Sequence, residues 1–545
     1  MKVYHKISVI ILSCLLTTGI YGQTIHDALR FSRTDLYGTA RSLAMGNAFT
    51  AIGGDVGAIS VNPASSGIYR HSEFVITPGV DNYTGTSDYL SSSSRGSKTR
   101  FCLGSFGVVG YIPTGRKTGL LNINWSVTGN QTAGYVSGTN ATGSNATSSW
   151  LASKAHQASV DGYGSGSLSY TSGAPWDING AYQSWQMSNF PNGQAPDPQD
   201  TYYLANTENL DFSRPLGRLN HLYSRNSWGY TYDFAANFAA NVDNKLFFGV
   251  NLVFQSIYYT DSECFREQAV DKSEFETGFE YMNYSYNRTT RGMGFKMAAG
   301  IIYRPFAGLS IGASVSTPTW TKMRDFWIQD VKGYSELYRD KKQESPSPEG
   351  DWSYKMTNPF QWNVGLGYTI GQSAVISVDY SNTNYSNVVF KTHNGPVGYY
   401  NALNDAVGTI MKSSHSVRTG LEVRVAKGIS VRGGYNFRTS PVEAKELEMN
   451  YIYGDDVERY FNGQNTQTWS LGAGFRTGNF FFDVAFQQQI ENVTEYKLFT
   501  DYYDLRMTEF PEKTIYTRDG DPVQAPLLTE RFRPWKLLIS VGFKF

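Results

Sequence analysis

Apolar and polar side chains alternate one by one along many segments of this chain. In the last segment the alternate positions are large and apolar: Trp535, Leu537, Ile539, Val541, Phe543 and Phe545. The positions between them include Lys536, Ser540, Gly542 and Lys544. Successive side chains of a β-strand point to opposite faces, so this pattern predicts a strand with one apolar face and one charged face.

The same alternation recurs earlier in the chain, in the segment 228–242. Its apolar face would carry Trp228, Tyr230, Tyr232, Phe234, Ala236, Phe238, Ala240 and Val242. Its opposite face would carry Thr231, Asp233, Asn237 and Asn241. Strands with this pattern are also predicted at 246–254, 362–370, 417–425 and 480–486. The pattern therefore predicts an all-β protein.

Short and long connections alternate between the predicted strands. Short turns rich in Gly, Pro or Asn are predicted at 112–117, 242–245, 304–308, 371–373, 426–428 and 476–479. Long polar loops are predicted at 84–98, 132–226, 261–290, 340–357, 387–414, 443–465 and 502–530. This layout is typical of bacterial outer-membrane barrels and gives about fourteen antiparallel strands in 72–545.

Composition favours a transmembrane barrel over a soluble all-β fold. Aromatic residues make up 15% of the chain and charged residues only 17%, and many aromatic residues fall on the predicted apolar faces. A barrel wall meets lipid with one face and a polar lumen with the other, which explains this division. Beyond residue 22, no apolar run reaches the roughly 18 to 20 residues that a spanning helix needs. The sequence thus predicts localisation in the cell outer membrane.

The first 22 residues have the features of a secretory signal peptide. Lys2 and Lys6 are followed by the apolar stretch 7–16 and by a small residue, Gly22. We therefore expect cleavage before Gln23.

The segment 23–71 does not alternate and is not predicted to belong to the wall. It is rich in Ala and Gly, with helical patterns at 24–31 and 39–51 and a loop-like stretch at 53–67. A compact piece of about fifty residues before a barrel is suitably sized to fill the lumen. The sequence therefore predicts a partly helical hatch that plugs the barrel.

The stretch YGTARSLAMGNAFTAIGGDVGAISVNPAS at 37–65 resembles the N-terminal hatch of the FadL/TodX family of outer-membrane transporters. The most specific element is Asn62-Pro63-Ala64. The resemblance implies passive transport of long-chain fatty acids or other hydrophobic small molecules through a plugged fourteen-stranded barrel. It also implies contact with outer-membrane lipids and recognition of the C-terminal Phe545 by the barrel-assembly machinery.

Two groups of residues are candidate functional sites. The hatch or gate candidates are Gly46, Asn47, Gly54, Asp55, Asn62, Pro63 and Ala64. Pro63 fixes φ and Asn62 can bind neighbouring backbone, which suits a movable gate and a rigid folding turn equally. The lumen ligand-binding candidates are Arg418, Arg424, Arg432 and Arg438. Guanidinium groups bind carboxylates in pairs of hydrogen bonds, but these arginines could also form ion pairs with Asp55 or with residues of the wall.

In the family that the hatch resembles, ligands are captured by extracellular loops and leave sideways at a kink in the third strand. Here the third strand is predicted at 120–130, where Gly129 is the one candidate for a bulge. The long loop 132–226 carries Trp150, Trp176 and Trp185. These rings suit either capture of an apolar ligand or packing over the barrel mouth.

Other function classes find little support. The chain has 47 basic and 47 acidic residues, so charge gives no case for nucleic acid. Enzyme motifs such as H-E-x-x-H and G-x-S-x-G are missing, and neither a metal site nor a cofactor is predicted. Cys102 and Cys264 could form one disulfide. Two alternatives stay open: a protein-binding barrel related to secretion shuttles, and a general porin for polar solutes.

Overall fold

A computed structural model describes most of the chain beyond the predicted signal peptide. The described residues are 23–35, 37–171, 174–189, 203–209, 217–442, 459–460, 464–504, 506–510, 513–517 and 520–545. The signal peptide predicted at 1–22 lies outside these residues. In the described ranges, no helix combines the length and the apolar character needed to cross a membrane.

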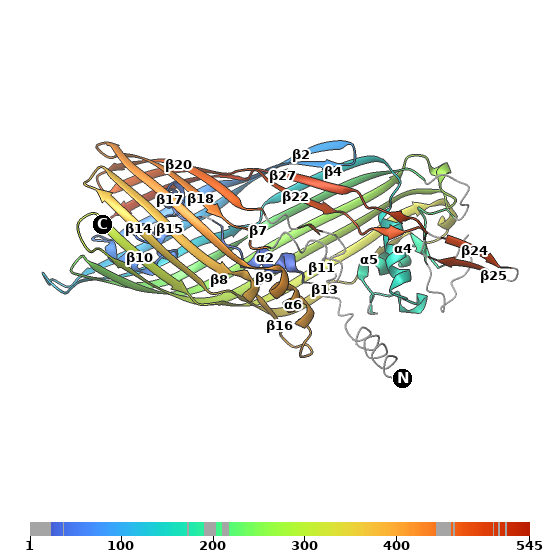
Figure 1. Cartoon of the computed structure of the whole chain (residues 1–545), viewed down its shortest axis with the longest axis horizontal. Helices are drawn as coiled ribbons and strands as arrows, with labels where there is room; N and C mark the ends of the chain where they lie inside the picture. The colour runs from blue at the N-terminus through green and yellow to red at the C-terminus, as the bar shows by residue number, and fades with distance from the viewer. Residues whose placement is uncertain are drawn as a thin grey trace.

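Fourteen strands of the described chain close into one barrel (Figure 1). They are β1 (Glu73–Tyr89), β2 (Ser92–Pro113), β3 (Leu120–Gly134), β7 (Leu219–Val242), β8 (Leu246–Ala269), β9 (Phe279–Tyr303), β10 (Leu309–Ser316), β14 (Gln361–Ile370), β15 (Ala374–Asn384), β17 (Ser413–Ala426), β18 (Ile429–Arg438), β20 (Thr466–Thr477), β21 (Phe480–Gln489) and β28 (Trp535–Lys544). Each strand pairs antiparallel with the next, and β28 pairs with β1. The predicted number of strands is confirmed.

The six predicted short turns all lie at one end of the barrel, where Figure 1 also places the C-terminus. At the other end the wall continues in further strands that extend the barrel strands. These are β4 (Ser137–Ala146), β11 (Thr319–Ser335), β12 (Glu344–Pro346), β13 (Gly350–Asn358), β16 (Val389–Thr392), β19 (Arg459–Tyr460), β22 (Asn492–Lys497) and β27 (Leu527–Phe532). The wall is therefore much longer on some sides than the sequence pattern predicted.

Three predicted loops are wrong for this reason, one of them 340–357, which contains β12 and most of β13. The range 84–98 was expected to be a loop, yet β1 and β2 stay paired as far as Tyr89 and Ser92. The loop expected at 261–290 shrinks to the residues between Ala269 and Phe279. Above the bilayer the outer face of a strand meets water instead of lipid, so both faces can be polar. The alternation that identifies a wall strand is lost there although the strand continues.

The orientation of the wall follows the predicted alternation. On β7, Phe234 and Phe238 are 42% and 58% exposed on the outer face, whereas Asn237 is fully buried on the inner face. Lys536 points inward, with its Nζ 3.4 Å from the ring centre of Tyr37 in the N-terminal segment. Arg418 likewise faces the lumen. An apolar outer face around a polar interior is the architecture of outer-membrane barrels, and the predicted register is confirmed.

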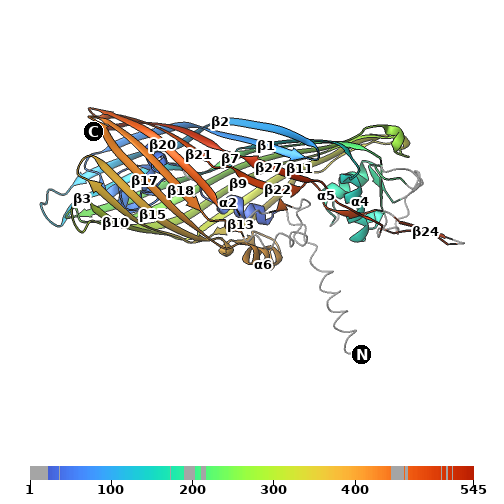
Figure 2. The ribbon, with the colours of Figure 1, turned by 45° about the horizontal axis from the view of Figure 1, so that its top comes forward.

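The N-terminal segment lies inside the barrel, shown in blue in Figure 2. It contains α2 (Ile25–Ser32), α3 (Ala40–Ala44), and two 3-10 helices, η1 (Gly57–Ser60) and η2 (Pro63–Ile68). The plug expected in the lumen is confirmed. The helix predicted at 39–51 is shorter than expected, because Gly46 and Asn47 take positive φ values of 60° and 56° and end it.

A cap of helices and short strands covers the end opposite the short turns. It includes α4 (Trp150–Val160), η3 (Ser165–Ser167), α5 (Trp176–Gln183), β5 (Met187–Ser188), β6 (Leu204–Ala205), η5 (Lys272–Glu274), η6 (Glu336–Tyr338), β23 (Tyr502–Tyr503) and β26 (Pro522–Val523). The hairpin of β24 (Arg506–Phe510) and β25 (Lys513–Thr517) extends beyond this cap in Figure 1. On one side, η7 (Tyr385–Asn387) and α6 (Asn401–Ile410) pack near α2. Trp150 is buried and stacks on Tyr284, and Trp185 packs on Tyr338. These two rings therefore pack within the cap.

Cys102 and Cys264 are free thiols.

Candidate functional site: the plug and the lumen

The side chain of Asn62 joins the plug to the barrel wall. Its amide donates hydrogen bonds to the carbonyl oxygens of Thr50 at 2.7 Å, Ile301 at 3.1 Å and Ala313 at 3.3 Å. Its Oδ1 accepts a hydrogen bond from the backbone N–H of Ala64 at 3.0 Å, which caps η2. Asn62 is completely buried, so one side chain both ends the plug turn and anchors it to β9 and β10.

Glycines in the wall make room for this turn. A Cβ on Gly300 would lie 1.9 Å from Oδ1 of Asn62, and a Cβ on Gly249 would lie 2.4 Å from the carbonyl oxygen of Pro63. That carbonyl accepts a hydrogen bond from the Asn237 amide at 3.0 Å. At Gly249 the plug backbone therefore lies directly against the inner surface of the wall, and at Gly300 the Asn62 side chain does so.

Replacing Gly300 with valine is expected to loosen this contact. The new side chain would overlap the Asn62 amide, and overpacking of this kind typically costs about 1–3 kcal/mol. We expect a lower free energy of unfolding in a urea titration of the barrel in lipid vesicles. Gly433→Val is the matched control, because a Cβ there meets only Leu471, at 3.8 Å. Equal losses in the two variants would contradict a close fit of plug and wall.

The other hatch candidates hold the plug's own shape. Oδ1 of Asp55 accepts hydrogen bonds from the Thr39 hydroxyl at 2.7 Å and from the backbone N–H of Gly57 at 2.9 Å. Asn47 donates to the carbonyl of Tyr37 at 2.8 Å. Within the described chain Asp55 forms no ion pair with the four candidate arginines, so of the two kinds of ion pair left open by the sequence, the one with Asp55 does not occur.

The remaining glycine candidates serve the backbone. Gly46 and Gly54 both have positive φ, 60° and 67°, which glycine adopts without strain. A Cβ on Gly46 would approach the backbone of Thr419 to 3.0 Å, so this residue also lies against the wall. The Gly54 carbonyl accepts a hydrogen bond from the Arg41 guanidinium at 3.2 Å.

A buried ion network joins the plug to strands β17, β18 and β21. Arg41 of the plug lies 2.8 Å from the Glu422 carboxylate, and Arg432 lies 2.8 Å from the same carboxylate. Arg432 also contacts Asp483 at 2.5 Å. The Arg432 guanidinium is therefore satisfied on both sides by wall carboxylates. The sequence left two hypotheses open for Arg432, binding of a ligand carboxylate and ion pairing. The geometry favours ion pairing within the wall.

Arg418 and Arg424 lie in different environments although both are on β17. Arg418 is 3.6 Å from Asp379, whose carboxylate accepts hydrogen bonds from the backbone N–H and hydroxyl of Thr50 at 2.8 and 2.7 Å. Asp379 thereby connects Arg418 to the plug. Arg424 is exposed near the short-turn end, where its backbone N–H bonds to Ser373. Arg424 therefore does not share a cavity with Arg418.

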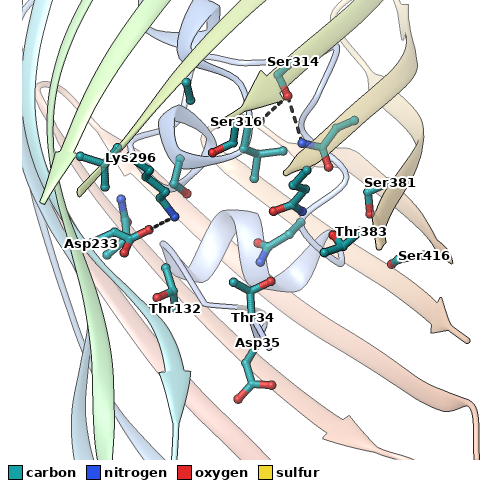
Figure 3. Close-up of a pocket in the computed structure, with 18 of the residues that line it drawn as sticks. Thr34, Asp35, Thr132, Asp233, Lys296, Ser314, Ser316, Ser381, Thr383 and Ser416 are labelled. Carbon is teal, nitrogen blue, oxygen red and sulfur yellow. Dashed lines mark hydrogen bonds and ion pairs between the residues drawn. The ribbon is translucent and has the colours of Figure 1, made fainter. Parts of the chain in front are cut away.

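A central cavity of about 130 Å³ lies between the plug and the wall (Figure 3). Its lining includes Thr34 and Asp35 of the plug and Asp233 and Lys296 of the wall. Lys296 and Asp233 form an ion pair at 2.6 Å, drawn in Figure 3. Arg418 lies on the same lining. The cavity is thus polar and contains charges of both signs.

Two larger cavities, of about 360 and 470 Å³, lie beside α2. Both are lined by Leu29, Arg30, Arg33, Tyr135 and Arg438, and Arg438 also lines the central cavity. In the described chain, Nε of Arg33 and Nη1 of Arg438 are buried without a hydrogen-bond partner. Two guanidinium groups with spare donors therefore border the same space.

A second ion network holds α2 in place. Asp27 lies 2.6 Å from Arg30 and 2.9 Å from Arg288 of β9. Arg288 also lies 2.8 Å from Asp325 of β11, and Asp325 accepts a hydrogen bond from the Gln23 amide at 2.8 Å. Sequence reasoning missed this network and Arg33. Its plug members lie in a segment without alternation, and the two contacts between plug and wall join residues 261 and 302 positions apart.

The third strand lacks the predicted irregularity. Gly129 pairs in regular register with Phe106 and Phe234, so the bulge expected there is wrong. Register shifts occur in β1 between Thr77 and Pro78 and in β3 between Gln131 and Ala133.

These features define the class of the protein as a plugged β-barrel of the outer-membrane type. Among solved structures, the chain is similar to a Pseudomonas aeruginosa FadL homologue, with 10% identity, a TM-score of 0.52, and coverage of 94% of this chain and 100% of that chain. The expected FadL-type architecture is thereby confirmed at the level of the fold.

Two further solved structures are similar to a lesser degree. The P. putida toluene transporter TodX has 10% identity and a TM-score of 0.48, with 94% of this chain and 99% of that chain covered. The Ralstonia pickettii toluene transporter TbuX has 12% identity and a TM-score of 0.47, with the same coverage. No protein-family model and no curated protein sequence matches the chain.

Proposed function

We propose that this barrel passively moves small molecules with an apolar body and an anionic end, such as fatty acids, across the outer membrane. We further propose that residues 23–71 act as the hatch, that 72–545 form the wall, and that 1–22 are removed on export. Recognition of Phe545 by the barrel-assembly machinery remains a prediction. The observation that carries the proposal is the composition of the 360 Å³ cavity beside α2.

This cavity combines apolar surface with guanidinium groups that keep a spare N–H donor, although Arg33 also lies 3.9 Å from the Asp35 carboxylate. Its apolar and aromatic lining includes Leu29, Tyr83, Ala133, Tyr135, Val136, Phe532 and Trp535. Arg33 and Arg438 border the same space. A guanidinium group binds a carboxylate through paired, charge-assisted hydrogen bonds, and the volume is within the range of small-molecule sites. A fatty acid matches both parts of this lining.

The plug must shift for such a ligand to continue along the lumen. Below the cavity the path meets the polar central space and the contacts of Asn62, Asp379 and Glu422 with the plug. We propose that these contacts hold a closed state, and that the hatch candidates around Asn62 form the gate. A ligand opens the gate only if it binds the open state more tightly than the closed one.

Uptake of a labelled long-chain fatty acid by cells tests this proposal. The double variant Arg33→Ala and Arg438→Ala is expected to reduce uptake by at least about tenfold, since the loss of even one charge-assisted hydrogen bond costs about 1.5–3 kcal/mol. Arg424→Ala is the matched control, because Arg424 is an exposed arginine of the same wall, outside the cavity. Unchanged uptake in the double variant, with normal barrel insertion, would refute the proposed site.

The polar central cavity favours one alternative, a general porin for polar solutes. Its lining of Asp233, Lys296 and Ser and Thr side chains would solvate a sugar better than a hydrocarbon. Swelling of vesicles that contain the protein distinguishes the two functions. Rapid entry of small sugars without fatty-acid uptake would favour the porin.

A further inference from the structure

Three lysines lie side by side on the outer surface of the wall. Lys322 of β11 is directly opposite Lys355 of β13, and Lys355 is directly opposite Lys391 of β16. All three are exposed, and the residues next to them in sequence, such as Met356 and Phe390, are buried inward. We call these three residues the lysine row.

The lysine row carries positive charge without a neutralising partner. In the described part of the chain, no ion pair or hydrogen bond involves any of the three ammonium groups. The neighbouring Asp351 forms an ion pair with Arg324, at 2.5 Å. Like charges directly opposite each other destabilise a sheet. An anion that bridges the ammonium groups would remove this repulsion.

The row lies where the apolar band of the wall ends. Two residues closer to the short turns, on the same outer face, the strands carry Trp320, which is 50% exposed, and Val389. Met293 of β9, opposite Lys322, is 78% exposed. Two residues further from the turns along β11, Arg324 is directly opposite Arg291 of β9. Because short turns face the periplasm in outer-membrane barrels, this boundary lies at the outer leaflet.

We propose that the lysine row binds the phosphate groups of a lipid headgroup in the outer leaflet. Lysine is a compact point charge that suits phosphate oxygens, and basic residues at a membrane surface attract anionic headgroups. The acyl chains of such a lipid would lie along Trp320 and Met293, while the lysine stems reach from the apolar boundary to the headgroup level. This site is on the outside of the barrel and is independent of the proposed transport function.

Native mass spectrometry of the purified full chain in neutral detergent tests the proposal, with phosphatidylglycerol and phosphatidylcholine as probes. The wild type is expected to retain phosphatidylglycerol in preference to phosphatidylcholine. The variant Lys322→Gln, Lys355→Gln, Lys391→Gln is expected to bind it at least about tenfold more weakly. The triple arginine variant, which keeps the charge, is expected to bind as the wild type does.

The control removes three lysines elsewhere in the extracellular part: Lys332→Gln, Lys341→Gln, Lys342→Gln. It is expected to leave lipid binding unchanged. Equal binding of the two lipids by the wild type, equal loss in the control, or competition by millimolar inorganic phosphate as strong as by the lipid would overturn the proposal. Heat-dependent mobility on gels confirms that each variant is a folded barrel before binding is compared.

Discussion

Replacing Arg432 with methionine is expected to lower the free energy of unfolding of the barrel by about 3–5 kcal/mol. Arg432 is nearly fully buried and contacts both Glu422 and Asp483. Its removal would leave Asp483 buried without its cation, while Glu422 would keep only Arg41. Urea titration in lipid vesicles, followed by tryptophan fluorescence, measures the change.

Two further variants show whether the effect arises from the buried charge. Arg432→Met combined with Asp483→Asn is expected to be more stable than Arg432→Met alone, because the uncompensated carboxylate is removed. Arg424→Met, an exposed arginine near the turns, is expected to change stability by less than about 0.5 kcal/mol. If Arg432→Met were as mild as Arg424→Met, the network would not hold the plug to the wall.

Replacing Asn62 with alanine is expected to cost about 2–4 kcal/mol and to free the plug from β9 and β10. The change removes three donated hydrogen bonds and leaves the buried N–H of Ala64 without its acceptor. Each buried polar group left unsatisfied costs about 1–3 kcal/mol. Urea titration measures the loss, and limited proteolysis of the folded barrel reports whether the N-terminal segment becomes accessible.

The variant also separates the two readings of the Asn62 turn. If the turn is a gate held closed, the variant still inserts, and small solutes pass faster in vesicle swelling. If the turn serves folding alone, the variant inserts poorly and the inserted fraction passes solutes as the wild type does. Asn140→Ala, at an exposed position of β4, is expected to match the wild type in each assay. A variant that matches the wild type throughout would contradict both readings.

The wall could be predicted because its two faces meet different media. Residues such as Phe238 and Asn237 are neighbours in sequence, yet one meets lipid and the other the plug. Charge is excluded from lipid, so alternation appears directly in the residue order. The short turns were equally clear, because Gly, Pro and Asn are required for their backbone conformations.

The strand extensions could not be predicted in the same way. Between Thr84 and Tyr89 the outer face of β1 meets water, whereas Ser87 and Tyr89 on the inner face are buried, so polar residues occur on both faces. Only its pairing with β2 and β27 shows that this stretch is a strand. For the same reason, the cap formed by α4 and α5 looked like a long loop.

The sequence alone determined the barrel, its strand number, its register and the presence of a plug. Each of these follows from contacts with lipid, water or near neighbours, which leave a local pattern. The tertiary structure alone decided which arginines are paired: Arg432 binds wall carboxylates, whereas Arg438 joins Arg33 of the plug at a cavity. Ion pairs and cavities depend on which distant residues meet after the barrel closes, and this information is absent from the local order of the chain.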